Sequence, residues 1–232
     1  MDWIALDKQW LLALNGSQSL FLDSLVKTLT TATTWIPLYV ALLYLVIKNS
    51  DNARKVLFTV GCALLCVLLA GSLDDMVVKP LVARWRPARD PEIGIFVDIV
   101  NGYRGGRFGF FSAHAANTFS LAVFFALLIR SRLMTVAMVT WSLVNCWTRL
   151  YLGVHYPGDI LAGLLWGGIV GTAMWFVYGK LLKTADVASN FVSSHYTSTG
   201  YQYQQIDVVV AVMAYTLVYA ILRATVSIYL FA

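Results

Sequence analysis

Charged residues are scarce in this sequence: Asp, Glu, Lys and Arg make up 12% of its 232 residues, against about a quarter in soluble domains. Hydrophobic residues make up 59%, and the mean hydropathy is +0.70. The formal net charge is +5, but no basic run or tail is present, which argues against nucleic acid as a partner. The composition therefore excludes an ordinary soluble domain and indicates an integral membrane protein.

Cysteine is also rare, with only Cys62, Cys66 and Cys146, all within apolar runs. An odd number in such positions supplies neither a disulfide framework nor zinc-ligand spacing, so we expect no metal and no cofactor. A cleavable signal peptide is not expected either, because Asp2 and Asp7 stand where a basic segment would lie. The first spanning helix is then expected to act as the insertion signal.

Long apolar runs dominate the sequence instead, and a run of about 20 apolar residues crosses the hydrocarbon core as a helix. Six spanning helices are predicted, at residues 30–47, 56–78, 112–130, 133–152, 159–182 and 206–231. The first begins either there or as early as Leu20, and Pro37 is a candidate kink. Glycines at four-residue spacing in the fifth, at 163, 167 and 171, permit close helix contact. The predicted fold is an all-α, six-transmembrane-helix bundle that forms a single membrane-embedded domain, residues 1–232.

Residues 1–16 are predicted to form an N-terminal amphipathic interfacial helix. Its apolar residues fall at helical spacing, and Asn15-Gly16 ends it. Tryptophans at residues 3 and 10 suit a helix in the headgroup layer. A small cap packed on the end of the bundle explains the pattern equally well.

Two connectors are long, and irregular backbone cannot lie in lipid. Residues 183–205 form a polar connector rich in Ser, Thr, Tyr and Gln. Residues 79–111 form a charged, aromatic loop with three glycines between 105 and 109, and loops of this length usually carry function. Six crossings place this loop, both termini and the turn between the fourth and fifth helices on one side, here called the active side.

The basic residues divide almost evenly between the two sides, but those of the opposite side lie in short loops with few acids. The positive-inside rule then favours the opposite side as cytoplasmic. For a multi-pass protein of a bacterial inner membrane, the active side is expected to face the periplasm or the outside.

Three polar clusters fall on the active side although they are far apart in the chain. They are Lys79 with Arg86-Pro87, Ser112-Ala113-His114, and Arg149 with His155 and Asp159. Three cations and a serine hydroxyl at the start of a helix, where backbone N–H groups are unpaired, suit a phosphate group without any metal. The sequence therefore predicts phosphate binding by Lys79, Arg86, Ser112 and Arg149.

Cleavage of a phosphoester needs a nucleophile and an acid for the leaving oxygen. A neutral His155 can attack phosphorus and form a phosphohistidine. Asp159, four residues later and a natural cap for the fifth helix, can hold the other ring nitrogen and stabilise the imidazolium. His114 can protonate the leaving group and later activate water. We therefore predict that these three residues are catalytic.

The clusters resemble the signature of the type 2 phosphatidic acid phosphatase (PAP2) family, in its membrane lipid phosphatase branch. That signature is K-x6-R-P, P-S-G-H and S-R-x5-H-x3-D. Here it reads Lys79…Arg86-Pro87, Phe111-Ser112-Ala113-His114 and Thr148-Arg149…His155…Asp159. The resemblance covers about residues 20–182. It implies the same roles for the seven residues, no metal, and a site facing the outer leaflet. Phe111, Ala113 and Thr148 depart from the pattern and remove no catalytic group.

The predicted function is an integral membrane lipid phosphatase that hydrolyses a phosphomonoester or diphosphate. Undecaprenyl diphosphate and lipid A phosphate are favoured, and phosphatidylglycerol phosphate and phosphatidic acid are possible. One alternative is a non-catalytic protein that binds or transports anionic lipid with a relic of the site. Another is a vanadate haloperoxidase, which the apolar runs argue against because those enzymes are soluble. The sequence leaves the oligomeric state open.

Other charged residues allow a functional or a plain structural interpretation. Arg104 and Arg107 either contact a second phosphate or sugar headgroup or lie in a solvated loop. Arg223, inside the last helix, is expected to contact the headgroup or pair with a residue such as Asp74, because a lone charge is costly in lipid. Snorkelling to the interface is the alternative. Asp75 is spaced to orient Lys79. Arg84 and Arg89 are interpreted as snorkelling residues and are not assigned to catalysis.

Overall fold

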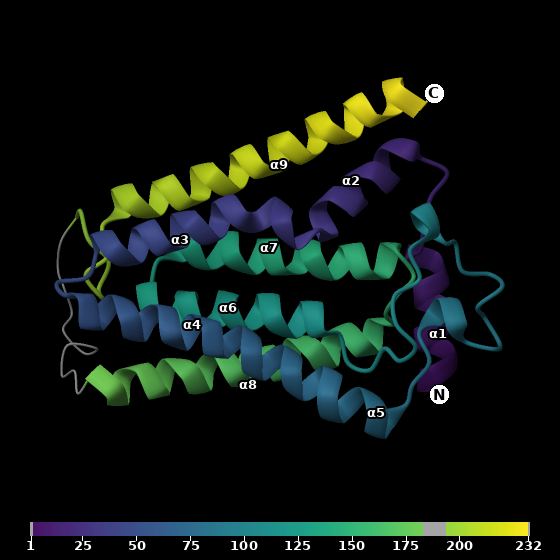
Figure 1. The fold of residues 1–232 in the computed structure, drawn as a ribbon, viewed down its shortest axis with the longest axis horizontal. Coiled ribbons are helices and arrows are strands. Elements are labelled where there is room, and N and C mark those ends of the chain that lie inside the picture. Colours follow the sequence, from purple (N-terminus) through teal and green to yellow (C-terminus); the bar gives the residue numbers. More distant parts are fainter. Residues whose placement is uncertain (1, 183–193, 232) are drawn as a thin grey trace.

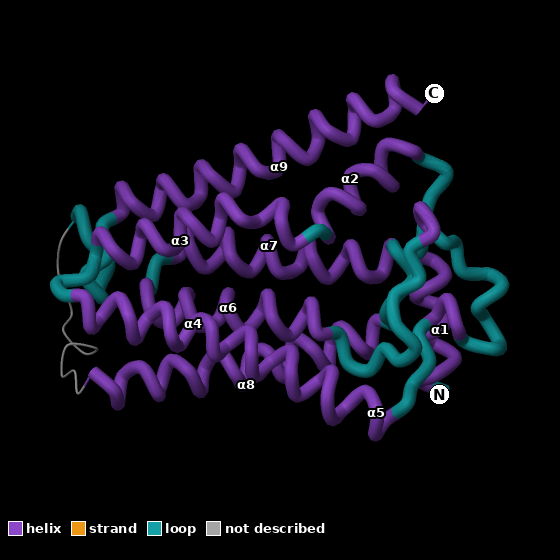
Figure 2. The backbone as a smooth tube through the Cα atoms, in the orientation of Figure 1, coloured by secondary structure: helices purple, strands orange, loops and turns teal. Residues whose placement is uncertain are grey.

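The computed structural model describes residues 2–182 and 194–231, and its regular structure is helical throughout those ranges. The helices are α1 Trp3–Leu14, α2 Leu20–Thr30, α3 Ile36–Lys48, α4 Ala53–Leu73, α5 Lys79–Val82, α6 Ala113–Ile129, α7 Arg132–Tyr151, α8 Pro157–Leu182 and α9 Tyr203–Phe231. The longer helices run roughly along one axis, and the loops gather at its two ends (Figures 1 and 2). The all-α prediction is confirmed.

Helix α6 lies at the centre of the bundle, where it packs against α4, α7 and α8. The closest approach is to α8, at the three glycines that the sequence spaces four residues apart. A Cβ at Gly167 would lie 2.5 Å from the carbonyl oxygen of Ala116, and one at Gly163 would lie 2.7 Å from that of Ser112. The predicted close contact through these glycines is confirmed, and it fixes the start of α6 beside the start of α8.

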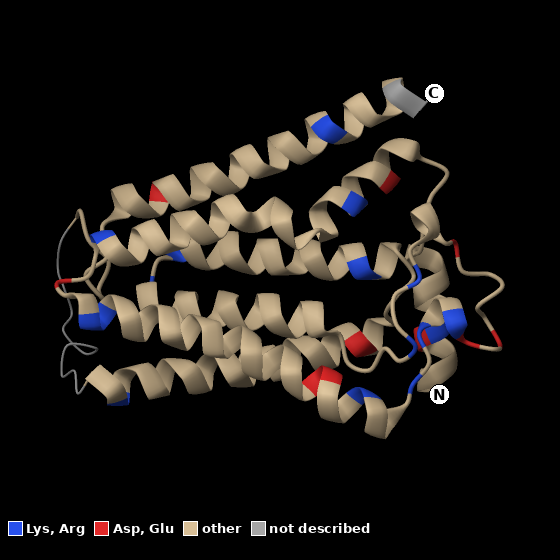
Figure 3. Ribbon diagram, in the orientation of Figure 1, with Lys and Arg blue, Asp and Glu red and all other residues tan. Residues whose placement is uncertain are grey.

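Length and apolarity identify fewer spans than the six predicted. Among the described residues, three continuous helical stretches qualify, at Ala53–Val82, Pro157–Leu182 and Tyr203–Tyr229. Helices α2 and α3 qualify together as one span bent by 67°, while α6 is a shorter apolar helix. The chain therefore has several apolar helices that can cross a bilayer. Charged residues lie mainly toward the two ends of the bundle (Figure 3), as a hydrocarbon core requires.

The first span has its break before Pro37 rather than at it. Helix α2 ends at Thr30 and a 3-10 turn, Ala32–Trp35, separates it from α3. Pro37 lies in the first turn of α3, where the missing N–H of proline costs no hydrogen bond. The predicted kink therefore exists, but its cause is the turn and not a proline inside a continuous helix. A helix does begin at Leu20, the earlier of the two predicted beginnings, but the bend after Thr30 separates it from α3.

Helix α1 lies across the end of the bundle, beside the loop of residues 79–111 (Figure 1). Asp2 caps its start, and Gly16, with φ +63°, follows its end. Leu11 is fully buried in a small cluster with Tyr156, whereas Trp3 and Trp10 are exposed. The inner face of the helix therefore acts as the cap of the bundle. The exposed tryptophans leave contact with a membrane surface as a prediction.

The polar connector predicted at residues 183–205 lies partly outside the described residues. Its described portion packs on the end of the bundle opposite α1, where Tyr201 is buried. The Thr199 hydroxyl donates a hydrogen bond to the carbonyl of Ile129, and the Gln202 N–H donates one to Asn49. This portion thus ties α9 to the ends of α3 and α6.

Candidate active site

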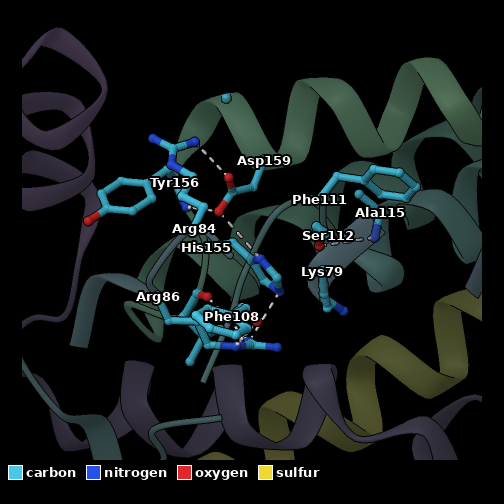
Figure 4. Close-up of polar contacts among 12 residues, drawn as sticks. Lys79, Arg84, Arg86, Phe108, Phe111, Ser112, Ala115, His155, Tyr156 and Asp159 are labelled. Atoms are coloured by element: carbon cyan, nitrogen blue, oxygen red, sulfur yellow. Dashed lines mark hydrogen bonds and ion pairs between the residues drawn. The ribbon is translucent and has the colours of Figure 1, made fainter. Parts of the chain in front are cut away.

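His155 lies in the short turn between α7 and α8, and its side chain is 2% exposed. Gly153 in the same turn adopts φ +61°, a left-handed conformation that favours glycine. The imidazole Nε2 lies 3.3 Å from Nη1 of Arg86, and Nδ1 lies 3.6 Å from Oδ2 of Asp159 (Figure 4). The ring is thus held between a cation and a carboxylate.

Asp159 is fully buried in the first turn of α8. Its Oδ2 accepts a hydrogen bond from the backbone N–H of Tyr156 at 2.9 Å, and its Oδ1 accepts one from Arg84 at 2.7 Å. The carboxylate therefore reaches back to the residue before the helix, as in a capping box. The expectation that Asp159 is itself the cap is wrong, because the helix begins two residues earlier at Pro157.

Arg86 is enclosed by the loop that carries it. Its Nε donates to the carbonyl of Phe108 at 3.0 Å, and its Nη1 donates to that of Val154 at 3.3 Å. Gly105 and Gly109 give the guanidinium room, since a Cβ at Gly105 would lie 2.8 Å from Nη1 and one at Gly109 3.1 Å from the Arg86 Cγ. The cluster of loop glycines therefore serves to wrap the backbone around Arg86.

Arg149, near the end of α7, is 2% exposed. Its Nη1 donates to the hydroxyl of Thr30 at 2.7 Å and its Nη2 to the hydroxyl of Tyr103 at 3.2 Å. Burial alone would raise the pKa of Tyr103, but the charges of Arg149 and Arg86 lower it overall. Sequence reasoning missed both partners, because each lies on a different element, α2 or the loop.

Lys79 lies at the start of α5 and is held by two carboxylates. Its Nζ lies 2.7 Å from Oδ2 of Asp74 and 2.5 Å from Oδ1 of Asp75. The prediction that Asp75 orients Lys79 is confirmed. Asp74 is fully buried and also accepts the N–H of Phe111 at 3.0 Å. Asp74 therefore lies inside the protein and is not part of a solvated helix end.

Ser112 and His114 lie at the start of α6. Ser112 is buried and caps the helix, and its Oγ accepts the N–H of Ala115. Its own N–H donates to the backbone carbonyl of Asp159 at 3.1 Å, which joins the starts of α6 and α8. His114 is half-buried, within electrostatic reach of His155 and Arg149.

The seven residues predicted for the site lie together at one end of the bundle. There His155 is within electrostatic reach of the three predicted cations. Burial lowers the pKa of His155 well below its ordinary value, and the charges of Arg86, Arg149 and Lys79 act in the same direction. The imidazole is therefore neutral at physiological pH, as a nucleophile must be. Three cations around a neutral, buried imidazole are an arrangement suited to binding an anion.

Arg84 is a site residue that sequence reasoning set aside as snorkelling, and that interpretation is wrong. Its guanidinium donates to Asp159 at 2.7 Å and to Asp7 of α1 at 2.6 Å. Residues 84 and 86 flank Trp85, which forms an isolated bridge with Phe108. Since alternate residues of extended chain share a face, the spacing of Arg84 and Arg86 could have indicated that both point toward the site.

The remaining basic residues lie outside this core. Arg107 stacks over Trp85 at 4.7 Å, and Arg104 is exposed. Arg223 lines a cavity of about 490 Å³ between α9 and the break between α2 and α3, and it donates to Tyr219. Its expected pairing with Asp74 is wrong, because Asp74 binds Lys79.

Comparison with known proteins agrees with this geometry. A family model described as the PAP2 superfamily matches residues 55–183. A lipid A 4′-phosphatase of Bacteroides thetaiotaomicron is 42% identical over 178 residues, which cover 76% of this chain and 78% of that protein. A lipid A 4′-phosphatase of Porphyromonas gingivalis is 35% identical over 77% of this chain and 75% of that protein. No solved structure matches the chain significantly.

A lipid A 1-phosphatase of Rhizobium etli is less similar, at 28% identity over 61% of this chain and 62% of that protein. The matched family region contains all seven predicted site residues, from Lys79 to Asp159. Because the family and these relatives are phosphatases, the non-catalytic alternative is set aside. The chain belongs to the PAP2 superfamily and is a membrane phosphatase.

Proposed function

We propose that this chain hydrolyses a phosphate ester of lipid A, with the 4′-phosphate as the preferred substrate. The two 4′-phosphatases share 42% and 35% of aligned residues with it, whereas the 1-phosphatase shares 28%. The names of these relatives refer to two phosphates of lipid A, at positions 1 and 4′. An enzyme for this lipid therefore has to distinguish the two phosphates. Similarity to these relatives therefore supports the choice of lipid A as substrate, and the geometry of the site supports the reaction.

The phosphate would bind among the guanidinium groups of Arg86 and Arg149 and the ammonium group of Lys79. Arginine offers a planar fork to phosphate oxygens and lysine a point charge. The unpaired N–H groups at the start of α6, after Ser112, would add hydrogen bonds and the positive end of the helix dipole. Lys79 would release part of its contact with Asp74 and Asp75 as the anion binds.

The reaction would proceed in two balanced steps. First, Nε2 of His155 attacks phosphorus, so that a P–N bond forms while the P–O bond to the lipid breaks. His114 takes up a proton as the negatively charged phosphate binds beside it and gives that proton to the leaving alkoxide, while Asp159 accepts a hydrogen bond from Nδ1 and stabilises the imidazolium. Second, water attacks phosphorus, so that a new P–O bond forms while the P–N bond to His155 breaks. His114 takes a proton from that water, phosphate is released, and the neutral imidazole of His155 is restored.

One observation carries the chemical proposal: the buried imidazole of His155 lies 3.3 Å from Arg86 on one side and 3.6 Å from Asp159 on the other. A carboxylate at Nδ1 favours the tautomer whose free lone pair is on Nε2. That lone pair then points toward Arg86, where an anion would sit. The arrangement suits in-line attack on a phosphate held by Arg86.

The proposed setting is a bundle of six membrane-spanning helices with the active end toward the periplasm. Helices α6 and α7 would supply the spans that length and apolarity alone leave out, since both lie inside the bundle, against other spans. Arg104 and Arg223 are exposed and have no acidic partner among the described residues, and we include them, with Arg107, as contacts for the lipid headgroup. The lipid would enter sideways from the outer leaflet.

The test is phosphate release by the purified protein from lipid A carrying both phosphates. Phosphatidic acid, phosphatidylglycerol phosphate and undecaprenyl diphosphate serve as comparison substrates. We expect the highest kcat/KM for lipid A, loss of the 4′-phosphate by mass spectrometry, and no turnover by His155→Ala. EDTA should leave the rate unchanged, because the proposed chemistry uses protein side chains alone. Preference for another lipid, or turnover by His155→Ala, would contradict the proposal.

A further inference from the structure

We propose that Arg84 is a positioning residue that keeps Asp159 charged and oriented toward His155, and that helix α1 holds Arg84 in place through Asp7. The proposal rests on the function proposed above, in which Asp159 supports the nucleophile. It makes the N-terminal helix part of the active-site machinery rather than a peripheral anchor.

The contacts form a continuous chain from α1 to the imidazole. Arg84 donates from Nη1 to Oδ1 of Asp159 at 2.7 Å and from Nη2 to Oδ2 of Asp7 at 2.6 Å. The other oxygen of Asp7 accepts the N–H of Gly158, in the first turn of α8, at 2.8 Å. Figure 4 shows Arg84 and His155 on either side of the Asp159 carboxylate. Asp7 thus binds both the guanidinium and the helix that carries Asp159.

Charge explains why Asp159 needs this partner. A carboxylate removed from water is costly unless it is paired and hydrogen-bonded. Asp159 is fully buried, and Arg84, with 25% of its side chain exposed, is the cation that pairs with it directly. An isolated buried carboxylate takes up a proton instead of remaining charged. Without Arg84, Asp159 would therefore be a poor acceptor for the Nδ1 proton of His155.

The same contacts also fix the direction of the carboxylate. With Oδ1 held by Arg84, Oδ2 is the oxygen that faces both the N–H of Tyr156 and Nδ1 of His155. At 3.6 Å, Nδ1 and Oδ2 are too far apart for a hydrogen bond, and Nδ1 has no hydrogen-bond partner among the described residues. A small shift would complete that bond when the imidazolium develops, and Arg84 limits the carboxylate to that orientation.

A second set of contacts holds α1 against the turn between α7 and α8. The guanidinium of Arg84 lies 4.2 Å from the ring centroid of Tyr156, whose hydroxyl donates to Asp90 at 2.7 Å. Asp90 in turn lies 3.3 Å from Nζ of Lys8, the residue after Asp7. Burial would raise the pKa of Asp90, but the hydrogen bond from Tyr156 and the contacts with Glu92 and Lys8 lower it overall. Arg84 is therefore held from two directions by groups that α1 supplies or supports.

The experiment compares kcat and KM of the full-length protein in detergent or lipid vesicles for Arg84→Ala, Arg84→Lys, Asp7→Asn and Arg89→Ala. Arg89 belongs to the same loop and its exposed side chain has no polar contact among the described residues, which makes it the matched control. Because a misplacement of about 1 Å in an active site can cost about 100-fold in rate, we expect Arg84→Ala to lower kcat by ~10- to 100-fold with KM little changed.

Rescue separates positioning from a purely structural role. Arg84→Lys should recover part of kcat, and added ethylguanidine should raise the kcat of Arg84→Ala while leaving Arg89→Ala unchanged. Asp7→Asn keeps an oxygen for Gly158 but loses the charge that holds Arg84, so we expect a smaller loss of kcat. Combined with Arg84→Ala, it should add little, since both changes break one chain of contacts.

Three results would overturn the inference. They are a normal kcat for Arg84→Ala, a rise in KM with no change in kcat, or a loss of activity that neither lysine at position 84 nor ethylguanidine restores. His155→Ala, measured beside these variants, separates the two proposals. If His155→Ala is inactive and Arg84→Ala is normal, only the role of Arg84 fails. If His155→Ala turns over, the proposed function itself fails.

Discussion

At the residue scale, the site depends on how buried charges are paired. Arg86 and Arg149 donate hydrogen bonds to backbone carbonyls and neutral hydroxyls, and their positive charge therefore remains available to an anion. Arg84 instead meets two carboxylates, so its charge is neutralised within the protein. Among these three arginines, the difference separates two that are suited to phosphate binding from one that is suited to positioning.

The loop glycines give the first prediction. Gly105 and Gly102 both have a positive φ, at +63° and +70°, so alanine at either costs about 1–2 kcal/mol of backbone strain. Only at Gly105 would the added methyl meet Arg86, whereas nothing lies within 4 Å at Gly102. We expect Gly105→Ala to lower kcat/KM by ~10-fold relative to Gly102→Ala at similar thermal stability. Equal activities would show that the loop does not position Arg86.

The buried imidazole gives a pH prediction for stability. The pKa of His155 is well below its ordinary value in the folded protein, chiefly because of burial. The unfolded chain binds that proton near pH 6.5, so the stability from a neutral His155 is present above about pH 6.5 and is lost as pH falls. We expect Tm to fall more steeply on acidification for the wild type than for His155→Gln. Parallel curves would contradict burial of a neutral ring.

The sequence was sufficient to locate the charged and titratable residues of the candidate site, because they fall in three short clusters of regular spacing. Lys79, His114 and His155 could each be placed on the correct end of the bundle. The loop of residues 79–111 places Arg84 at the same end, but the sequence does not predict its pairing with Asp7, which lies 77 residues away in the chain. A contact between an N-terminal helix and a loop leaves no local pattern in the sequence.

At the element scale, helix positions were predicted well and their ends less well. The predicted second span at 56–78 extends in the structure to 53–82, because a π-turn at Asp74–Val78 continues α4 into α5. That turn places Asp74 inside the protein and next to Lys79. Apolar periodicity predicts such a helix, but it does not reveal a π-turn at the end of the helix. The side chains of that turn keep nearly the same spacing as those of an α-helix.

Packing of α6 on α8 gives an element-scale prediction. A Cβ at Gly167 would meet the backbone of Ala116 at 2.5 Å, whereas one at Gly168 would meet only the side chain of Phe119 at 3.4 Å. Overpacking against backbone typically costs about 1–3 kcal/mol. We expect Gly167→Ala to lower Tm and kcat together, because it separates Ser112 from Asp159. Gly168→Ala should resemble the wild type, and equal effects of the two changes would contradict this packing.

At the scale of the whole molecule, the fold brings three distant motifs to one end of a bundle whose middle is nearly free of charge (Figure 3). The lid of this end is made by α1 and the loop of residues 79–111, and the opposite end carries the described part of the connector before α9. The number of crossings could not be fixed from length and apolarity, because α7 carries polar residues that face its neighbours rather than lipid.

Membrane orientation is tested by labelling. The three native cysteines are buried, so single cysteines at exposed positions report their own side of the membrane. We expect a membrane-impermeant maleimide added to intact cells, with the outer membrane permeabilised, to label Arg104→Cys and not Arg54→Cys. Labelling of the second variant alone would place the active end in the cytoplasm.

The central claim is that His155 carries the phosphoryl group during turnover, and trapping that intermediate tests it most directly. Protein mixed with lipid A labelled with ³²P at the 4′-phosphate is quenched within milliseconds in alkali, where a phosphohistidine survives. We predict a labelled, acid-labile adduct on the peptide that contains His155, absent from His155→Ala, whose amount rises before free phosphate appears. Release of labelled phosphate by the wild type without any protein-bound label at the earliest times would contradict the account.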